Sequence, residues 1–112
     1  MDYVEYKKLV RDNIPEIIKS QGRTPTTSVL SELDYKIELE KKLLEECNEV
    51  IESNSETRLN ELADVLEVVM ALCKLNGNTY DELREACDKK REKNGAFNKR
   101  IFLENVIDEK QD

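Results

Sequence analysis

The sequence predicts an all-α protein, and three features of its 112 residues support that prediction. Glu, Lys and Leu favour helices and are abundant, whereas Gly occurs three times, Pro twice and Trp not at all. Apolar residues recur at three- and four-residue spacings. Ser or Thr followed three residues later by an acidic residue marks two helix starts. We expect four helices in a bundle, within one domain spanning residues 1–112, because the chain is too short for two stable cores.

Two helices are expected in the amino-terminal half. Pro15 suits the first turn of a short helix that ends near Gly22. An ordered connector over residues 23–30 leads to Ser31, whose capping-box spacing with Asp34 begins a long helix that runs to about residue 53. The apolar face of this long helix contains Leu39, Leu43, Cys47, Val50 and Ile51.

Two more helices are expected in the carboxyl-terminal half. After a turn near residues 53–55, the third helix runs to Asn76 and stops at Gly77, a residue type common after helix ends. Thr79 and Glu82 form a second capping box, which begins a fourth helix ending near residues 94–95. The rest of the chain is expected to pack back on the bundle as an arm. Its apolar residues are Phe97, Ile101, Phe102, Leu103 and Val106.

Composition excludes several classes of function. The net charge is −7, from 25 acidic and 18 basic residues, which argues against binding to nucleic acid or to anionic membranes. No run of about 18 apolar residues and no secretory leader pattern is present, so we expect a soluble, cytoplasmic protein. Histidine is absent, which excludes Cys–His and Ser–His–Asp catalysis. The three cysteines lack CxxC spacing, which argues against a disulfide framework or a zinc site.

The third expected helix carries carboxylates among apolar residues. Between Leu62 and Cys73, every residue except Asp64 and Glu67 is apolar, so this helix is expected to be buried on nearly all sides. Glu61 and Asp64 lie about 60° apart around the helix axis and would face the packed side. Buried carboxylates are costly unless a cation accompanies them. Lysine, arginine or a metal ion would each serve.

The second expected helix brings two more carboxylates to the same depth. In a hairpin folded about residue 55, Glu49 and Glu61 lie six residues on either side of the fold, and Glu46 and Asp64 lie nine on either side. Four carboxylates at matched depth would form an oxygen-only site of the kind that Mg²⁺ or Mn²⁺ prefers. The alternative is that the glutamates of the second helix form a solvated face, but this alternative does not predict the matched depths.

Two acidic motifs resemble those of a known superfamily. Residues 45–49 (EECNE) and 61–64 (ELAD) are similar to the EExxE and ExxD motifs of the MazG-like, all-α nucleoside triphosphate pyrophosphohydrolases, which include phosphoribosyl-ATP pyrophosphohydrolases. Residues 8–15 (KLVRDNIP) and 90–97 (KREKNGAF) resemble its small bacterial and phage members. The connection between the two motifs is short for the superfamily. The resemblance implies Mg²⁺-dependent hydrolysis between the α- and β-phosphates, which releases a monophosphate and pyrophosphate.

The resemblance also suggests roles for individual residues. Glu46, Glu49, Glu61 and Asp64 would hold Mg²⁺, which lowers the pKa of an attacking water. Glu45 or Glu46 would accept the proton of that water.

Positive charge for the leaving pyrophosphate is available near the end of the fourth helix. The candidates for substrate binding are Lys90, Arg91, Lys93, Asn94 and Arg11. Pairing of the basic cluster with the negative end of the helix dipole is an equally good explanation, and the same ambiguity applies to Arg11 and Arg23. Asn94 and Phe97 suit either base recognition or capping and core packing.

The apolar third helix exceeds what so short a chain can cover, so a homodimer or larger homo-oligomer is expected. Two alternatives to a nucleoside triphosphate pyrophosphohydrolase stay open. One is a phosphoribosyl-ATP pyrophosphohydrolase. The other is a non-catalytic helical module that oligomerises or binds a partner helix.

Overall fold

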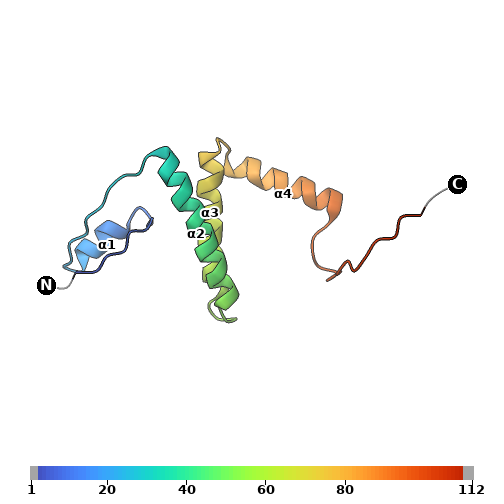
Figure 1. Ribbon diagram of the computed structural model, residues 1–112, viewed down its shortest axis with the longest axis horizontal. Coiled ribbons are helices and arrows are strands. Elements are labelled where there is room, and N and C mark those ends of the chain that lie inside the picture. The colour runs from blue at the N-terminus through green and yellow to red at the C-terminus, as the bar shows by residue number, and fades with distance from the viewer. Residues whose placement is uncertain (1–2, 110–112) are drawn as a thin grey trace. The chain divides into compact units, whose positions relative to one another are not determined.

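The computed structural model describes residues 3–109, and all the regular elements in that range are α-helices. They are α1 (Ile14–Ser20), α2 (Glu32–Glu52), α3 (Arg58–Leu75) and α4 (Tyr80–Asn94), as labelled in Figure 1. The all-α prediction is therefore confirmed. None of these helices is both long and apolar enough to cross a membrane.

The chain divides into two compact units, one up to Tyr80 and the other from Asp81 onward. The first unit contains α1, α2 and α3, and the second contains most of α4 and the segment after it. A bundle of all four helices, a single domain and an oligomer remain predictions.

Local sequence signals place the ends of the long helices. The Ser31 side-chain oxygen accepts a hydrogen bond from the Asp34 backbone N–H at 3.2 Å, as a capping residue does. Gly77 has a φ of 87°, in the left-handed region that glycine adopts without strain, and it ends α3 as the sequence predicts. Both ends of α2 and the end of α3 therefore lie within one or two residues of their predicted positions.

The start of α3 depends on Asn54, a residue that the sequence analysis did not single out. The Asn54 Oδ1 accepts hydrogen bonds from the backbone N–H groups of Glu56 and Thr57, each at 3.0 Å. The Thr57 hydroxyl in turn accepts from the Asn54 backbone N–H at 3.3 Å. This reciprocal capping closes the turn between α2 and α3 and thereby fixes how the two helices align.

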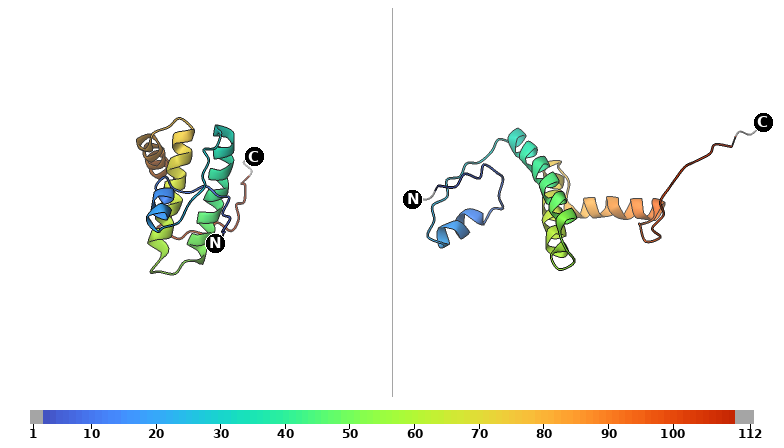
Figure 2. Two further views of the ribbon diagram at one scale, coloured as in Figure 1. Left: turned by 90° about the vertical axis from the view of Figure 1, so that its left-hand side faces the viewer. Right: turned by 60° about the horizontal axis from the view of Figure 1, so that its bottom comes forward.

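The core of the first unit lies between α2 and α3, which pack side by side as a helical hairpin (Figure 2). Leu39 from α2 and Val68 from α3 are its buried apolar residues. The expected burial of α3 on nearly all sides is wrong for the single chain, because Leu59, Leu62 and Leu66 are 77%, 47% and 46% exposed. One neighbouring helix covers one face of α3 and leaves these leucines uncovered.

The segment after α4 does not pack as an arm within its own unit, the one from Asp81 onward. Its apolar side chains are exposed, from 73% for Leu103 to 97% for Phe97. Residues 95–109 contain no regular helix or strand, so their apolar side chains do not line up as one continuous stripe for packing. Their exposure leaves an apolar surface uncovered in the single chain.

Candidate metal centre

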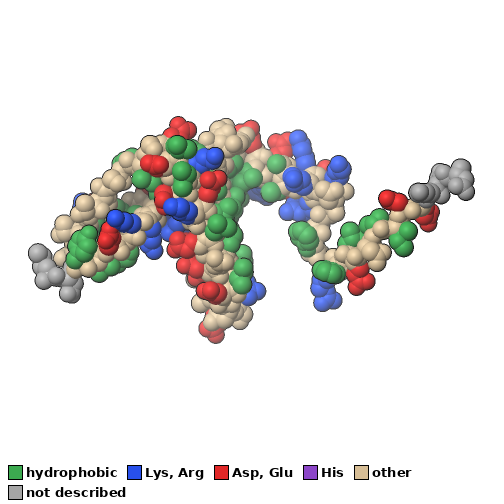
Figure 3. Space-filling view, in the orientation of Figure 1, with side chains coloured by type: hydrophobic (Ala, Val, Ile, Leu, Met, Phe, Trp, Pro, Cys, Tyr) green, Lys and Arg blue, Asp and Glu red, His purple; other side chains and the backbone are tan. Residues whose placement is uncertain are grey.

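Four carboxylates converge in the middle of the α2–α3 hairpin. Glu46 and Glu49 come from α2, and Glu61 and Asp64 come from α3. One carboxylate oxygen of each residue lies within 4.8 Å of the corresponding oxygens of the other three. The alignment of α2 and α3 in the hairpin thus brings together the two pairs predicted to lie at matched depth, Glu49 with Glu61 and Glu46 with Asp64. Figure 3 shows acidic side chains gathered along the hairpin.

Two oxygens of this cluster are buried without a hydrogen-bond partner. Glu46 is 7% exposed, and its Oε2 makes no hydrogen bond. The Oε2 of Glu61 is likewise buried and unpartnered. Buried polar atoms are nearly always hydrogen-bonded in folded proteins, because an unpaired one loses its interactions with water and gains nothing in exchange. These two oxygens therefore suit a ligand.

The environment of the cluster favours the neutral forms of Glu46 and Glu61. Burial is the main cause that raises the pKa of Glu46 to about 7. A hydrogen bond that the neutral Glu46 carboxyl donates to Glu49, and charge repulsion from Glu49, add to it. Lys42 opposes this effect, whereas Asp64 contributes to it. The pKa of Glu61 is raised too, by loss of hydration first and then by Glu49 and Asp64. Protons on Glu46 and Glu61 would therefore compete with a metal ion for these carboxyl groups.

Two basic side chains compensate part of the negative charge. The Lys42 Nζ lies 3.7 Å from the Glu46 Oε1, one helical turn away. The Arg11 Nη2 donates a hydrogen bond of 2.6 Å to the Asp64 Oδ1. Two cations against four carboxylates leave two negative charges when all four are ionised, which is the charge that one divalent cation neutralises. The i,i+4 spacing of Lys42 and Glu46 is a sequence signal for the first pair.

Glu45 lies outside this cluster. Its side chain is exposed on α2, and the converging group contains its neighbour Glu46 instead. Of the two predicted proton acceptors, Glu46 is thus the one that the fold brings to the other carboxylates.

The remaining predicted substrate-binding residues lie near the carboxyl end of α4, in the second unit. Lys90, Arg91, Lys93 and Asn94 are all exposed, and Arg91 pairs with Asp88 at 3.1 Å.

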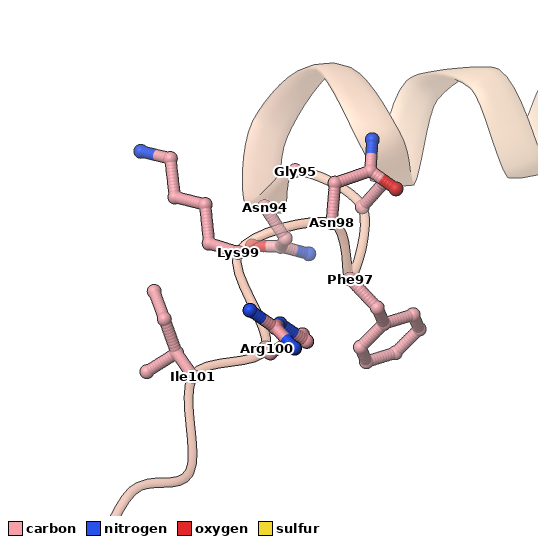
Figure 4. Close-up of a pocket in the computed structure, with 8 residues that line it drawn as sticks. Asn94, Gly95, Phe97, Asn98, Lys99, Arg100 and Ile101 are labelled. Atoms are coloured by element: carbon pink, nitrogen blue, oxygen red, sulfur yellow. The ribbon is translucent and has the colours of Figure 1, made fainter.

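Asn94 also helps to line a hollow of about 330 Å³, formed by residues 94–101 (Figure 4). Lys99 and Arg100, which line the same hollow, were not among the residues predicted from the sequence. The basic composition of residues 89–100 is the sequence feature that could have identified Lys99 and Arg100. Figure 4 shows Phe97 and Lys99 extending in different directions from this turn.

These features define an all-α protein with a carboxylate cluster suited to a divalent cation. Among known proteins, an uncharacterized protein of Mycolicibacterium smegmatis is 49% identical to this chain over 43 residues. The match covers 38% of this chain and 44% of that protein, so it spans less than half of either one. No family model matches the chain, and no solved structure matches it.

Proposed function

We propose that this protein is a Mg²⁺-dependent nucleotide pyrophosphohydrolase, similar to the MazG-like enzymes that its acidic motifs resemble. The reaction would cleave the α–β phosphoanhydride bond of a nucleoside triphosphate and release a monophosphate and pyrophosphate. The observation that carries this proposal is the convergence of Glu46, Glu49, Glu61 and Asp64 with the buried, unpartnered Oε2 atoms of Glu46 and Glu61. In an ion-pair cluster without a bound cation, buried carboxylate oxygens normally have hydrogen-bond partners.

The donor set fits a hard divalent cation. All four residues offer carboxylate oxygens, which Mg²⁺ and Mn²⁺ prefer, and the set contains no nitrogen or sulfur. The cluster contains more acidic than basic side chains, and its net negative charge attracts a cation. Glu46, Glu49, Glu61 and Asp64 would hold the ion.

When bound, Mg²⁺ would polarise phosphate oxygens and lower the pKa of a coordinated water. The side chains of the hairpin supply the remaining functions. Glu46 belongs to the converging group, which makes it the first candidate to accept the proton of that water. Glu45 is the second candidate for this role, because its exposed side chain adjoins the cluster in the sequence.

Basic side chains would bind the phosphates. Arg11 is the candidate that contacts the carboxylate cluster, through Asp64. Lys90, Arg91, Lys93 and Asn94 remain candidates from the second unit, and favourable interaction with the carboxyl end of α4 is the competing explanation for the three basic residues. Binding of the developing pyrophosphate by such groups is the usual requirement of phosphoryl transfer.

The exposed leucines of α3 support the proposal that the protein works as a homodimer or a larger homo-oligomer. Leu59, Leu62 and Leu66 are exposed in the single chain, and an apolar helix face of this kind is normally covered in solution. The same observation favours the second candidate function, a non-catalytic helical module that binds a partner helix. That module would bind neither metal nor nucleotide.

The decisive experiment incubates the purified protein with canonical and modified nucleoside triphosphates and with phosphoribosyl-ATP, in Mg²⁺ or in EDTA, and identifies the products by chromatography. A monophosphate and pyrophosphate that form only with Mg²⁺ are the expected products. Turnover of phosphoribosyl-ATP alone would indicate that the protein is a phosphoribosyl-ATP pyrophosphohydrolase instead. A diphosphate with phosphate would contradict the assigned bond, and no turnover of any compound would favour the helical module.

A further inference from the structure

Arg11 joins the amino-terminal segment to the carboxylate cluster. It precedes α1 and lies 53 residues from Asp64 in the sequence, yet its Nη2 donates to the Asp64 Oδ1 at 2.6 Å. Asp64 is also one of the four converging carboxylates. A carboxylate accepts up to about four hydrogen bonds or metal contacts through its two oxygens. Asp64 therefore retains capacity for a cation while it is bonded to Arg11.

The guanidinium of Arg11 has donors to spare. An arginine carries five N–H donors in a rigid plane, and the bond to Asp64 uses one of them. The Arg11 side chain is 55% exposed, so a ligand that enters from solvent can reach it. A planar fork of this kind binds two phosphate oxygens at once, which a lysine ammonium does not do.

We infer that Arg11 bridges Asp64 and a diphosphate group bound at the carboxylate cluster. In this role Arg11 keeps its bond to Asp64 and donates its other N–H groups to non-bridging phosphate oxygens. The inference rests on the proposed function, because it requires a cation at the cluster. It makes Arg11 a binding residue for the phosphates that also contacts one of the carboxylates of the cluster.

The sequence offers a matched comparison in Arg23. Both arginines were open candidates from the sequence alone, both belong to the first unit, and both are exposed. The structure separates them, because none of the ion pairs found among residues 3–109 includes Arg23, whereas Arg11 pairs with Asp64. A change at Arg23 removes the same charge from the same unit without touching the cluster.

Bridging predicts effects of opposite sign on two ligands. Without phosphate, the Arg11 charge repels a cation at the cluster, so removal of that charge leaves divalent-cation affinity unchanged or higher. With phosphate, the same removal deletes charge-assisted hydrogen bonds, and affinity falls about 10- to 100-fold. A residue that merely held the amino-terminal segment on α3 would not produce this pair of effects.

The test uses full-length wild type, Arg11→Gln, Arg11→Lys and Arg23→Gln, with two probes. Mn²⁺ binding is measured by electron paramagnetic resonance, and pyrophosphate binding by calorimetry at a fixed free Mg²⁺ concentration. Arg11→Gln should bind Mn²⁺ at least as tightly as wild type and pyrophosphate about 10- to 100-fold more weakly. Arg11→Lys should recover part of the pyrophosphate affinity, and Arg23→Gln should match wild type.

Each contrary result has a definite meaning. Wild-type pyrophosphate affinity in Arg11→Gln, or full recovery in Arg11→Lys, would overturn the bridging role and leave the metal centre standing. Weaker binding of both probes by Arg11→Gln would show that Arg11 only orients Asp64. Failure of the wild-type protein to bind Mn²⁺ would remove the proposed metal centre and the inference together.

Discussion

The α2–α3 hairpin and residues 89–100 both concentrate charge of one sign, but they do so differently. In the hairpin, four carboxylates from two helices are brought within 4.8 Å of one another, and two of their oxygens are buried and unpartnered. Residues 89–100 hold six basic side chains and one acidic one, all exposed. The basic residues are Lys89, Lys90, Arg91, Lys93, Lys99 and Arg100.

The difference shows where a ligand is needed for charge balance. Exposed like charges are hydrated and screened by salt, so the basic segment is stable without an anion. In the hairpin, the Oε2 atoms of Glu46 and Glu61 are buried and lack hydration, and Lys42 and Arg11 compensate part of the negative charge of the cluster. Substitutions in the hairpin should therefore change the stability of the metal-free protein as well as its activity. Substitutions in the basic segment should have an effect only when its ligand is present.

The largest expected effect comes from removal of one carboxylate from the hairpin. Glu49→Gln and Asp64→Asn should each lower Mg²⁺-dependent turnover by at least about 100-fold, because each replaces a charged carboxylate ligand with a neutral amide. Thermal unfolding of the metal-free variants should occur at the wild-type temperature or higher, because repulsion within the cluster is relieved. Glu52→Gln, on α2 but outside the cluster, is the control. Full activity in both cluster variants would disprove the site.

The pH dependence of metal binding should follow Glu46. Its pKa of about 7 means that a proton occupies it below neutral pH and must leave before a cation binds. Apparent Mg²⁺ affinity should thus fall by about tenfold per pH unit between pH 7 and pH 5. Calorimetry at pH 5, 6, 7 and 8 measures this slope. An affinity that is constant across that range would contradict the raised pKa.

The basic segment is tested by a variant with Lys90, Arg91 and Lys93 all changed to Gln. If these side chains bind phosphate, KM for the substrate should rise by about tenfold or more. Mg²⁺ binding without nucleotide should stay at the wild-type level. Steady-state kinetics measures the first effect and calorimetry the second. An unchanged KM together with a lower unfolding temperature would assign these residues to the helix dipole instead.

Metal-free stability should respond to Glu46→Gln in a pH-dependent way. The folded-state pKa of Glu46 lies above its ordinary value of 4.5, so its contribution to stability is fully present below pH 4.5 and is lost as pH rises through about 7. At pH 8 the variant should be more stable than wild type by about 1–2 kcal/mol, and at pH 4.5 the two should be equal. Urea unfolding at both pH values measures this difference. A variant less stable than wild type at pH 8 would be the contrary result.

The smallest effect concerns the scaffold of the hairpin rather than its site. Ser31→Ala removes the hydrogen bond to the Asp34 backbone N–H and should destabilise the fold by about 1 kcal/mol. Turnover per folded molecule should be unchanged, because Ser31 lies about four turns of α2 before the cluster. Urea unfolding and active-site titration measure the two quantities. Lost turnover at full stability would mean that the start of α2 takes part in the site.

Much of the hairpin was predictable, because its determinants are local or periodic. The capping spacing at Ser31 and the glycine at position 77 mark helix ends through hydrogen bonds to nearby residues. The positions of Glu46 and Asp64 then follow from regular helix geometry once the turn is placed. Periodicity gave no information on Arg11, because its partner is 53 residues away and residues 3–13 contain no helix.

The exposed surfaces were predicted less well. Apolar composition suggested that α3 and the segment after α4 are covered, yet Leu59 and Phe97 are exposed in the single chain. Composition indicates that a residue tends to be buried, but it does not identify which chain or segment covers it. Lys42 was missed for another reason, because its pairing with Glu46 matters only once Glu46 is buried.

The sequence by itself determined the helical class, the helix ends and the matched depth of the four carboxylates, since these depend on backbone hydrogen bonds and on the fixed rise of a helix. The tertiary structure decided which charges meet. Packing of α2 against α3 buries the Oε2 atoms of Glu46 and Glu61, and a long-range contact brings Arg11 to Asp64. Burial and distance set the strength of electrostatic interactions, and both exist only after the chain has folded.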